Sequence, residues 1–212
     1  MARKGSTANM SSVEGDDLAT GTSLGCETSS VLYARILGSS WLDLAPCIQR
    51  LHTTFSPNAL RGRFEIRRGK RWAPRACAEW LRLPGEASSV DVQLVVEQRR
   101  RDEMWVRQFG KVRIITTQWR SEEGLLWERF GKIELGFRLG LDDGQLVYRQ
   151  QKARLHMGCC SLPLPRWFAP RVSATEKTCG NDVKVSVEVR LPWLGLLVAY
   201  DGLVYGNEGL RA

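Results

Sequence analysis

The strongest constraint on the fold is an alternation of apolar and polar residues that begins at Val90 and continues to Tyr205. A period of two places successive side chains on opposite faces of a β-strand. Short turn sequences rich in Gly, Asp and Asn separate the alternating segments, and links of that length join only antiparallel neighbours. We therefore expect an antiparallel meander with strands over 90–98, 104–109, 111–119, 125–130, 132–141, 145–155, 172–178, 183–191 and 197–205.

Earlier in the chain, the segment 63–67 also alternates, and three short segments have helical patterns. The helices are expected over 31–37, from Pro46 to about residue 53, and over 72–83. In the last of these, Trp72 and Trp80 fall on one face, which predicts that this face packs onto the sheet. Long antiparallel strands twist and coil. The fold class predicted is α+β: a curved, mostly antiparallel sheet of eight to nine strands that can close partly into a barrel, covered by a few short helices.

Composition indicates one ordinary globular domain, because the chain has 212 residues with 43% hydrophobic and 25% charged. The segment 1–30 is rich in Gly, Ser and Thr, so we expect a disordered tail there, a single domain over 31–206 and a flexible end over 207–212. The longest apolar stretch is too short for a membrane helix and no secretory signal is visible, so a cytoplasmic location is expected. The six cysteines form no Cys-x-x-Cys pair, and no metal site or cofactor is predicted.

The formal net charge is +8, and a basic run lies between Arg61 and Arg75. Such a run can contact polyanions. The aromatic residues within it, Phe64 and Trp72, fall on the expected apolar faces and are poor platforms for stacking bases, so nucleic acid is an unlikely partner. Peripheral contact with an anionic membrane surface remains open, as does a merely solvated basic face.

Two segments are the candidates for a binding site. Glu128 and Arg129 are adjacent in one short strand and point to opposite faces, so one charged side chain is expected on the concave side of the sheet, unless both lie on a surface strand. The segment 162–170 contains three prolines, which exclude it from a central strand. We interpret it as an irregular connection whose Trp167 and Phe168 plug one end of the sheet. No residue is predicted to be catalytic.

Five sequence stretches resemble the bacterial family catalogued as domain of unknown function 4166. They are WVRQFG at 105–110, WERFG at 127–131, LDDG at 141–144, LPLPRWFAPR at 162–171 and LPWLGLLVAYDG at 191–202. The resemblance implies no established chemistry. It does imply occurrence either alone or behind nicotinamide-dependent oxidoreductase-like domains, which suggests a binding or accessory module with an oxidoreductase as a possible partner.

Three functions are compatible with these observations. The first is a non-catalytic binder of an apolar or amphipathic small molecule, with Glu128, Arg129, Trp167 and Phe168 as ligand contacts. The second is an enzyme or oxidoreductase-associated accessory subunit that acts on a hydrophobic substrate. The third is a basic module that binds an anionic membrane surface. We favour the first, because so coiled a sheet is expected to leave an apolar pocket on its concave face.

Overall fold

The computed structural model describes residues 31–205, and the expectations for 1–30 and 206–212 lie outside the described residues. The helical elements precede most of the sheet: α1 Leu32–Leu37, the 3-10 turn η2 Gly38–Trp41, α2 Pro46–Thr53 and α3 Trp72–Trp80. The strands are β1 Ala59–Arg68, β2 Ala87–Gln98, β3 Glu103–Phe109, β4 Val112–Arg120, β5 Leu126–Phe130, β6 Ile133–Asp142, β7 Gln145–Met157, β8 Cys160–Pro163, β9 Arg171–Cys179, β10 Asp182–Leu191 and β11 Gly195–Tyr205. No helix among these residues is long and apolar enough to cross a membrane.

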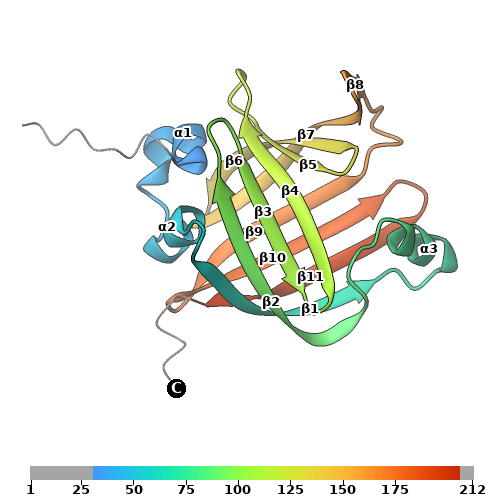
Figure 1. Cartoon of the computed structure of the whole chain (residues 1–212), viewed down its shortest axis with the longest axis horizontal. Helices are drawn as coiled ribbons and strands as arrows, with labels where there is room; N and C mark the ends of the chain where they lie inside the picture. The colour runs from blue at the N-terminus through green and yellow to red at the C-terminus, as the bar shows by residue number, and fades with distance from the viewer. Residues whose placement is uncertain (1–30, 206–212) are drawn as a thin grey trace, which may run out of the picture.

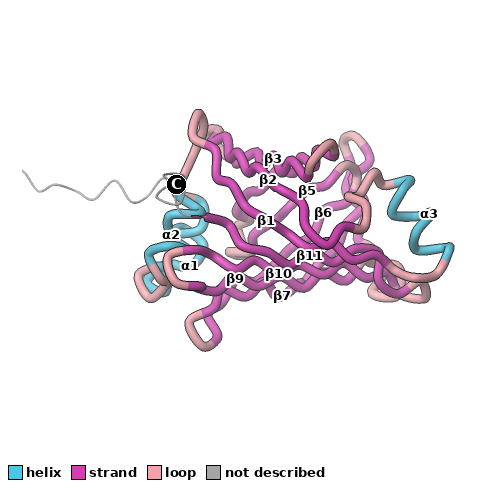
Figure 2. The backbone as a smooth tube through the Cα atoms, turned by 90° about the horizontal axis from the view of Figure 1, so that it is seen from below, coloured by secondary structure: helices cyan, strands magenta, loops and turns pink. Residues whose placement is uncertain are grey.

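The sheet closes on itself (Figures 1 and 2). All eleven strands within residues 31–205 belong to one antiparallel sheet with the order β6-β5-β4-β3-β2-β1-β11-β10-β9-β7-β8, and β6 also pairs with β7. That pairing joins the two ends into an up-and-down barrel, with β8 attached outside it to β7. The antiparallel α+β class and the curved sheet are confirmed. Closure is complete, and the ring has ten strands rather than eight to nine because β1 bridges β2 and β11.

One local expectation was wrong, and another was right except at its start. The segment 162–170 was expected to be an irregular connection outside any central strand. Residues 164–170 are irregular, with a turn at 166–168, and only Leu162 and Pro163 belong to a strand, the edge strand β8. Its proline is tolerated because β8 pairs on one side only, with β7. The face of α3 that carries Trp72 and Trp80 does not pack on the sheet: these two side chains are 83% and 81% exposed. The residues that α3 buries are Pro74 and Ala78, because the helix lies across the rim of the barrel instead of on its wall.

Different helices lie at the two ends of the barrel. Helices α1 and α2 lie at one end and α3 at the other (Figure 1). At the first end Tyr33, Ile48 and Leu51 are buried and belong to the same apolar core as the inward residues of the strands. Strand β1 shows the inward pattern clearly, with exposed and buried residues alternating along its length. This end of the barrel is therefore sealed by packed side chains.

Close packing between β1 and β11 depends on glycine. A Cβ atom built on Gly202 would lie 2.3 Å from the carbonyl oxygen of Arg63 and 2.5 Å from the ring of Phe64. Only glycine allows that ring to lie flat against the neighbouring strand, where it also contacts Phe109 and Tyr200 at ring-centroid distances of 6.0 Å. This cluster forms part of the inner wall.

Candidate ligand-binding site

The barrel encloses a cavity of about 380 Å³. Its walls are the inward side chains of the strands, and most are aliphatic or aromatic, as in Val92, Phe137, Val187 and Leu197. Residues of α3 and of the 164–170 segment line it at one end, and Tyr33 and Leu51 line it at the other. The volume falls in the range typical of sites for small organic ligands.

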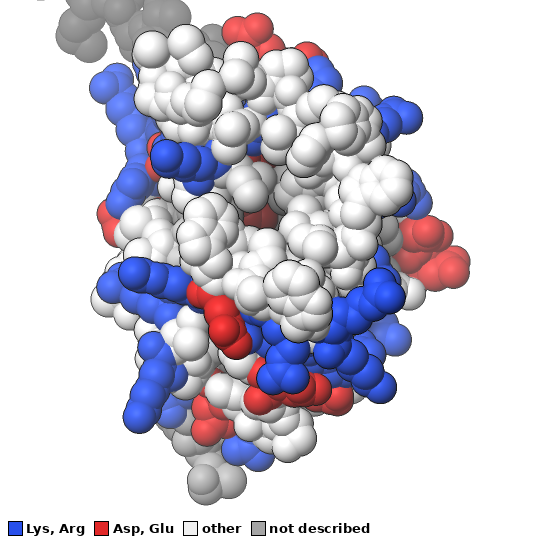
Figure 3. Space-filling view, turned by 90° about the vertical axis from the view of Figure 1, so that its right-hand side faces the viewer, with Lys and Arg blue, Asp and Glu red and all other residues white. Residues whose placement is uncertain are grey.

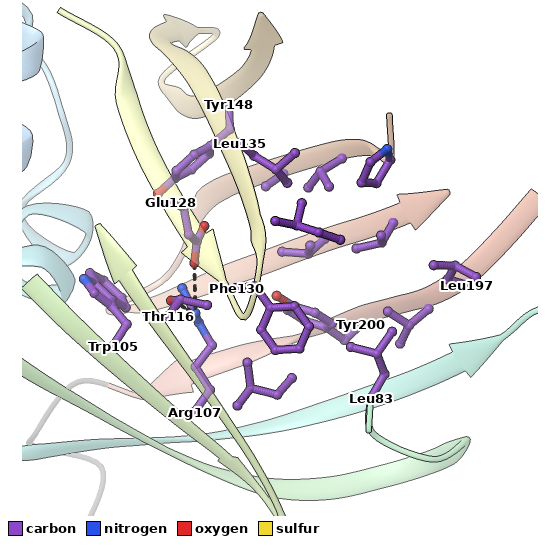
Figure 4. Close-up of a pocket in the computed structure, with 18 of the residues that line it drawn as sticks. Leu83, Trp105, Arg107, Thr116, Glu128, Phe130, Leu135, Tyr148, Leu197 and Tyr200 are labelled. Carbon is purple, nitrogen blue, oxygen red and sulfur yellow. Dashed lines mark hydrogen bonds and ion pairs between the residues drawn. The ribbon is translucent and has the colours of Figure 1, made fainter. Parts of the chain in front are cut away.

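A polar cluster interrupts this apolar wall (Figure 4). Nη1 of Arg107 donates hydrogen bonds to Thr116 Oγ1 at 2.8 Å and to Glu128 Oε1 at 3.2 Å. The three residues come from the neighbouring strands β3, β4 and β5, whose register brings their inward side chains together. About one fifth of each charged side chain, 19% for Arg107 and 21% for Glu128, remains accessible. Since both residues line the cavity, that area is available to a molecule inside it.

The electrostatics keep the guanidinium charged. Burial of Arg107 lowers its pKa, but the Glu128 carboxylate opposes this effect and, with smaller contributions from Tyr200 and Tyr33, leaves the pKa above its usual value. The guanidinium also lies over the ring of Trp105, 5.2 Å from its centroid. Burial raises the pKa of Tyr200, so its hydroxyl group remains protonated. The cluster thus contains one compensated ion pair and neutral hydroxyl groups.

A second polar network lies under the helices. Tyr33 Oη donates to Gln118 Oε1 at 2.9 Å, and Tyr148 Oη donates to Glu176 Oε1 at 2.7 Å. The other carboxylate oxygen of Glu176 lies 2.8 Å from Nε2 of His52, whose ring stacks on Tyr33 with centroids 3.6 Å apart. Burial, reinforced by Glu176, raises the pKa of both tyrosines well above the usual value. This network joins the helices to β4, β7 and β9 and closes that end.

Glu103 attaches α1 to the barrel. Its two carboxylate oxygens accept hydrogen bonds from the backbone N–H of Leu32, at 3.4 Å, and from the indole N–H of Trp105, at 3.1 Å. Burial raises the pKa of Glu103, and the two hydrogen bonds only partly offset that effect. The carboxyl group therefore has a structural role at the start of the helix.

The structure separates the four residues predicted from sequence as ligand contacts. Glu128 and Phe168 line the cavity. Arg129 points out of the barrel, where it lies 3.8 Å from Glu134 and stacks over Trp119. Trp167 is 58% exposed beside Phe168, with ring centroids 4.4 Å apart, and is not among the residues that line the cavity.

Sequence reasoning missed Arg107, although the signal was present. In the stretch WVRQFG, Trp105, Arg107 and Phe109 share one face because they alternate. An arginine between two inward aromatic residues needs a buried partner, as does a glutamate between Leu126 and Phe130. Pairing β3 with β5 through β4 would have connected the two. Glu176 had no comparable signal, because its partners lie far away in sequence.

Fold and site together define an up-and-down β-barrel with an internal, mainly apolar cavity. Its wall includes the polar cluster of Arg107, Thr116 and Glu128 and, near the helices α1 and α2, groups of the second polar network. The chain belongs to the family described as domain of unknown function DUF4166, whose model matches residues 44–204. No curated protein and no solved structure matches the chain.

Proposed function

We propose that the protein binds an apolar or amphipathic small molecule inside the barrel, as a carrier or binding module. The observation that carries this proposal is the mainly apolar cavity inside the barrel, whose wall includes the charge-compensated pair Arg107–Glu128. A barrel that only needed stability would fill its interior, because empty volume lined by apolar groups destabilises a fold. An apolar ligand recovers that lost contact energy.

The polar cluster indicates what the ligand's polar end is. All hydrogen bonds of Arg107 to other described side chains use Nη1, which leaves Nε–H and Nη2–H to donate to a ligand. Glu128 receives Arg107 on Oε1, which leaves Oε2 to accept. A group that both donates and accepts, such as a hydroxyl, matches this pair.

Charge balance favours a neutral polar end. Glu128 already compensates Arg107. A ligand carboxylate would add a second negative charge beside Glu128, and a ligand ammonium would add a second positive charge beside Arg107; each placement is unfavourable in an apolar interior. The proposed ligand is therefore an apolar chain or ring system that carries a hydroxyl or a similar neutral group.

Displacement of a neutral apolar dye, N-phenyl-1-naphthylamine, tests this proposal. We expect saturable binding at one site, and we expect 1-dodecanol to displace the dye at concentrations at least tenfold lower than dodecanoate or dodecylamine. The double variant Arg107→Met/Glu128→Leu should retain dye binding and lose the preference for the alcohol. Arg149→Met serves as the control, because Arg149 forms an exposed ion pair with Asp142.

A matched pair of larger side chains shows whether the dye binds in the cavity. Val187→Phe fills the cavity, whereas Ile115→Phe places the same ring on an outward, 42% exposed position. Dye affinity should fall for the first variant and remain unchanged for the second. Equal affinity in both folded variants, or a dodecanoate preference in the wild type, would contradict the proposal.

A further inference from the structure

The end of the barrel that carries α3 exposes a group of large aromatic side chains. We define the aromatic rim as Trp72, Trp80, Trp167, Phe168 and Trp193. Their exposed fractions are 83%, 81%, 58%, 62% and 87%. Exposed apolar patches of this kind on a folded domain mark interaction surfaces.

The rim brings together three segments that are distant in sequence. Trp72 and Trp80 belong to α3, Trp167 and Phe168 to the connection that follows β8, and Trp193 to the turn between β10 and β11. The indole N–H of Trp193 donates to the backbone oxygen of Trp167 at 3.2 Å. Trp80 and Phe168 also line the cavity, so the rim surrounds its mouth.

The backbone of Trp193 supports a functional reading of the rim. Its φ is +71°, in the left-handed region that bulky residues rarely occupy. The structure thus holds a tryptophan in a strained conformation with its ring in water, although a glycine or asparagine would suit the same turn at lower cost. Strain of this kind collects at sites of function.

Basic side chains lie next to the aromatic rim. Segments 67–86 and 162–171 contain eight Lys and Arg against two Glu. Lys70, Arg71 and Arg166 are exposed, and within residues 31–205 they form no ion pair. Lys70 and Arg71 also line a surface hollow together with Trp193. Figure 3 shows this side of the molecule, with uncharged residues around a central hollow and basic residues beside them.

We propose that the aromatic rim and its basic neighbours dock the protein on an anionic membrane surface, with the mouth of the cavity facing the bilayer. Indole rings favour the membrane interface because each has an apolar body and a polar N–H. Lysine and arginine next to them attract anionic headgroups. A protein partner on the rim would cover the mouth, whereas a bilayer offers an apolar medium there. Docking requires only the rim and its basic neighbours, so its test does not depend on whether the ligand proposed above binds in the cavity.

Co-sedimentation of the full chain with vesicles tests the docking. The vesicles are phosphatidylcholine alone or phosphatidylcholine with 30% phosphatidylglycerol. We expect partition onto the anionic vesicles to exceed that onto neutral vesicles at least tenfold, and to fall when NaCl is raised from 0.1 to 0.5 M. Brominated lipid should quench the tryptophan fluorescence of the bound wild-type protein.

Variants localise the contact. Trp72→Ser/Trp193→Ser should lower partition at least tenfold, and Lys70→Glu/Arg71→Glu should lower it on anionic vesicles only. The controls lie at the opposite end of the barrel: Leu42→Ser, which replaces a 78% exposed leucine, and Arg100→Glu/Arg101→Glu in the β2–β3 turn. Thermal melting confirms that each variant folds, as expected for exposed positions, and dye binding in the cavity should persist in the rim variants.

Three results would overturn the proposal. The first is wild-type protein that stays in solution with anionic vesicles. The second is an equal loss of partition in the rim variants and in the controls from the opposite end. The third is a protein that does not bind vesicles but forms a dimer in sedimentation velocity, with the dimer dissociated in the tryptophan variants. That result would assign the rim to contacts between copies of this chain.

Discussion

Replacing Glu128 by Leu would leave the Arg107 guanidinium without its carboxylate partner inside an apolar cavity. Removing one partner of a buried ion pair typically costs about 3–5 kcal/mol of unfolding free energy. About one fifth of each side chain remains accessible to the cavity. Water can therefore reach the orphaned charge, and we expect a loss near the lower end of that range, about 3 kcal/mol. The hydrogen bond from Arg107 to Thr116 Oγ1 at 2.8 Å should survive.

The double variant Arg107→Met/Glu128→Leu removes both charges and substitutes apolar groups of similar size. Replacement of a buried ion pair by well-packed apolar residues is often neutral or stabilising. We therefore expect the double variant to lie within about 1 kcal/mol of the wild type, so that the losses in the single variants Glu128→Leu and Arg107→Met are strongly non-additive. The double variant recovers this unfolding free energy without any new hydrogen bond, because neither replacement side chain carries a charge that must be solvated.

Urea unfolding followed by circular dichroism at 222 nm measures the cycle, with the slope of free energy against urea checked for constancy among the variants. The exposed ion pair Arg149–Asp142, removed by Arg149→Met and Asp142→Leu, is the control, where the cycle should give less than about 1 kcal/mol. If the double variant loses the sum of the two single losses, the pair is not coupled across the cavity and the charge argument for the ligand fails with it.

Three further predictions concern the wall and the helix anchor. Val187→Asp places a carboxylate among the apolar cavity residues and should cost several kcal/mol, whereas Glu188→Lys on the outer face should cost under about 0.5 kcal/mol; urea unfolding of both compares the two faces. Gly202→Ala brings a Cβ to 2.3 Å from a backbone oxygen and should cost about 1–3 kcal/mol in thermal unfolding, while Gly85→Ala, with nothing within 4 Å, should be nearly neutral. Burial raises the pKa of Glu103 in the folded protein above its unfolded value near 4.5. Its contribution to the free energy of unfolding is therefore fully present below pH 4.5 and is lost as the pH rises through the higher folded pKa. Glu103→Gln should flatten the pH dependence of stability above pH 4.5, and an unchanged slope would contradict this assignment.

Local alternation was sufficient to predict the strands. Most expected strand boundaries differ from the observed ones by one to three residues, as in the segment 183–191, which became β10 Asp182–Leu191. The extent of a strand follows the stretch over which one face is buried, and the alternation of apolar and polar residues shows that face directly. Complete closure was left open, because it depends on the pairing of β1 with β11, which lie far apart in sequence, and no local period encodes such a contact.

The errors at the site have a physical origin too. The tryptophans of α3 were assigned to the sheet because apolar residues at helical spacing are usually buried. That rule fails here because α3 lies on the rim, where Trp72 and Trp80 are 83% and 81% exposed. Arg107 was missed for the opposite reason, since a charged residue in an alternating strand is ordinarily taken as outward. Both exceptions occur where the structure departs from what stability alone would select.

The two ends of the barrel differ in how readily each can open to the cavity. Under α1 and α2, Tyr33, Tyr148 and Glu176 are tied together by buried hydrogen bonds, and opening that end would leave several polar groups unsatisfied. At the α3 end, Trp80 and Phe168 line the mouth with side chains that are already largely exposed, so moving them breaks little packing. The proposed ligand would therefore enter and leave past the aromatic rim. It follows that variants of Trp72 and Trp193 should change the rate at which a bound dye exchanges with vesicles while leaving its affinity intact, whereas variants of Arg107 and Glu128 should change the affinity for a hydroxyl-bearing ligand.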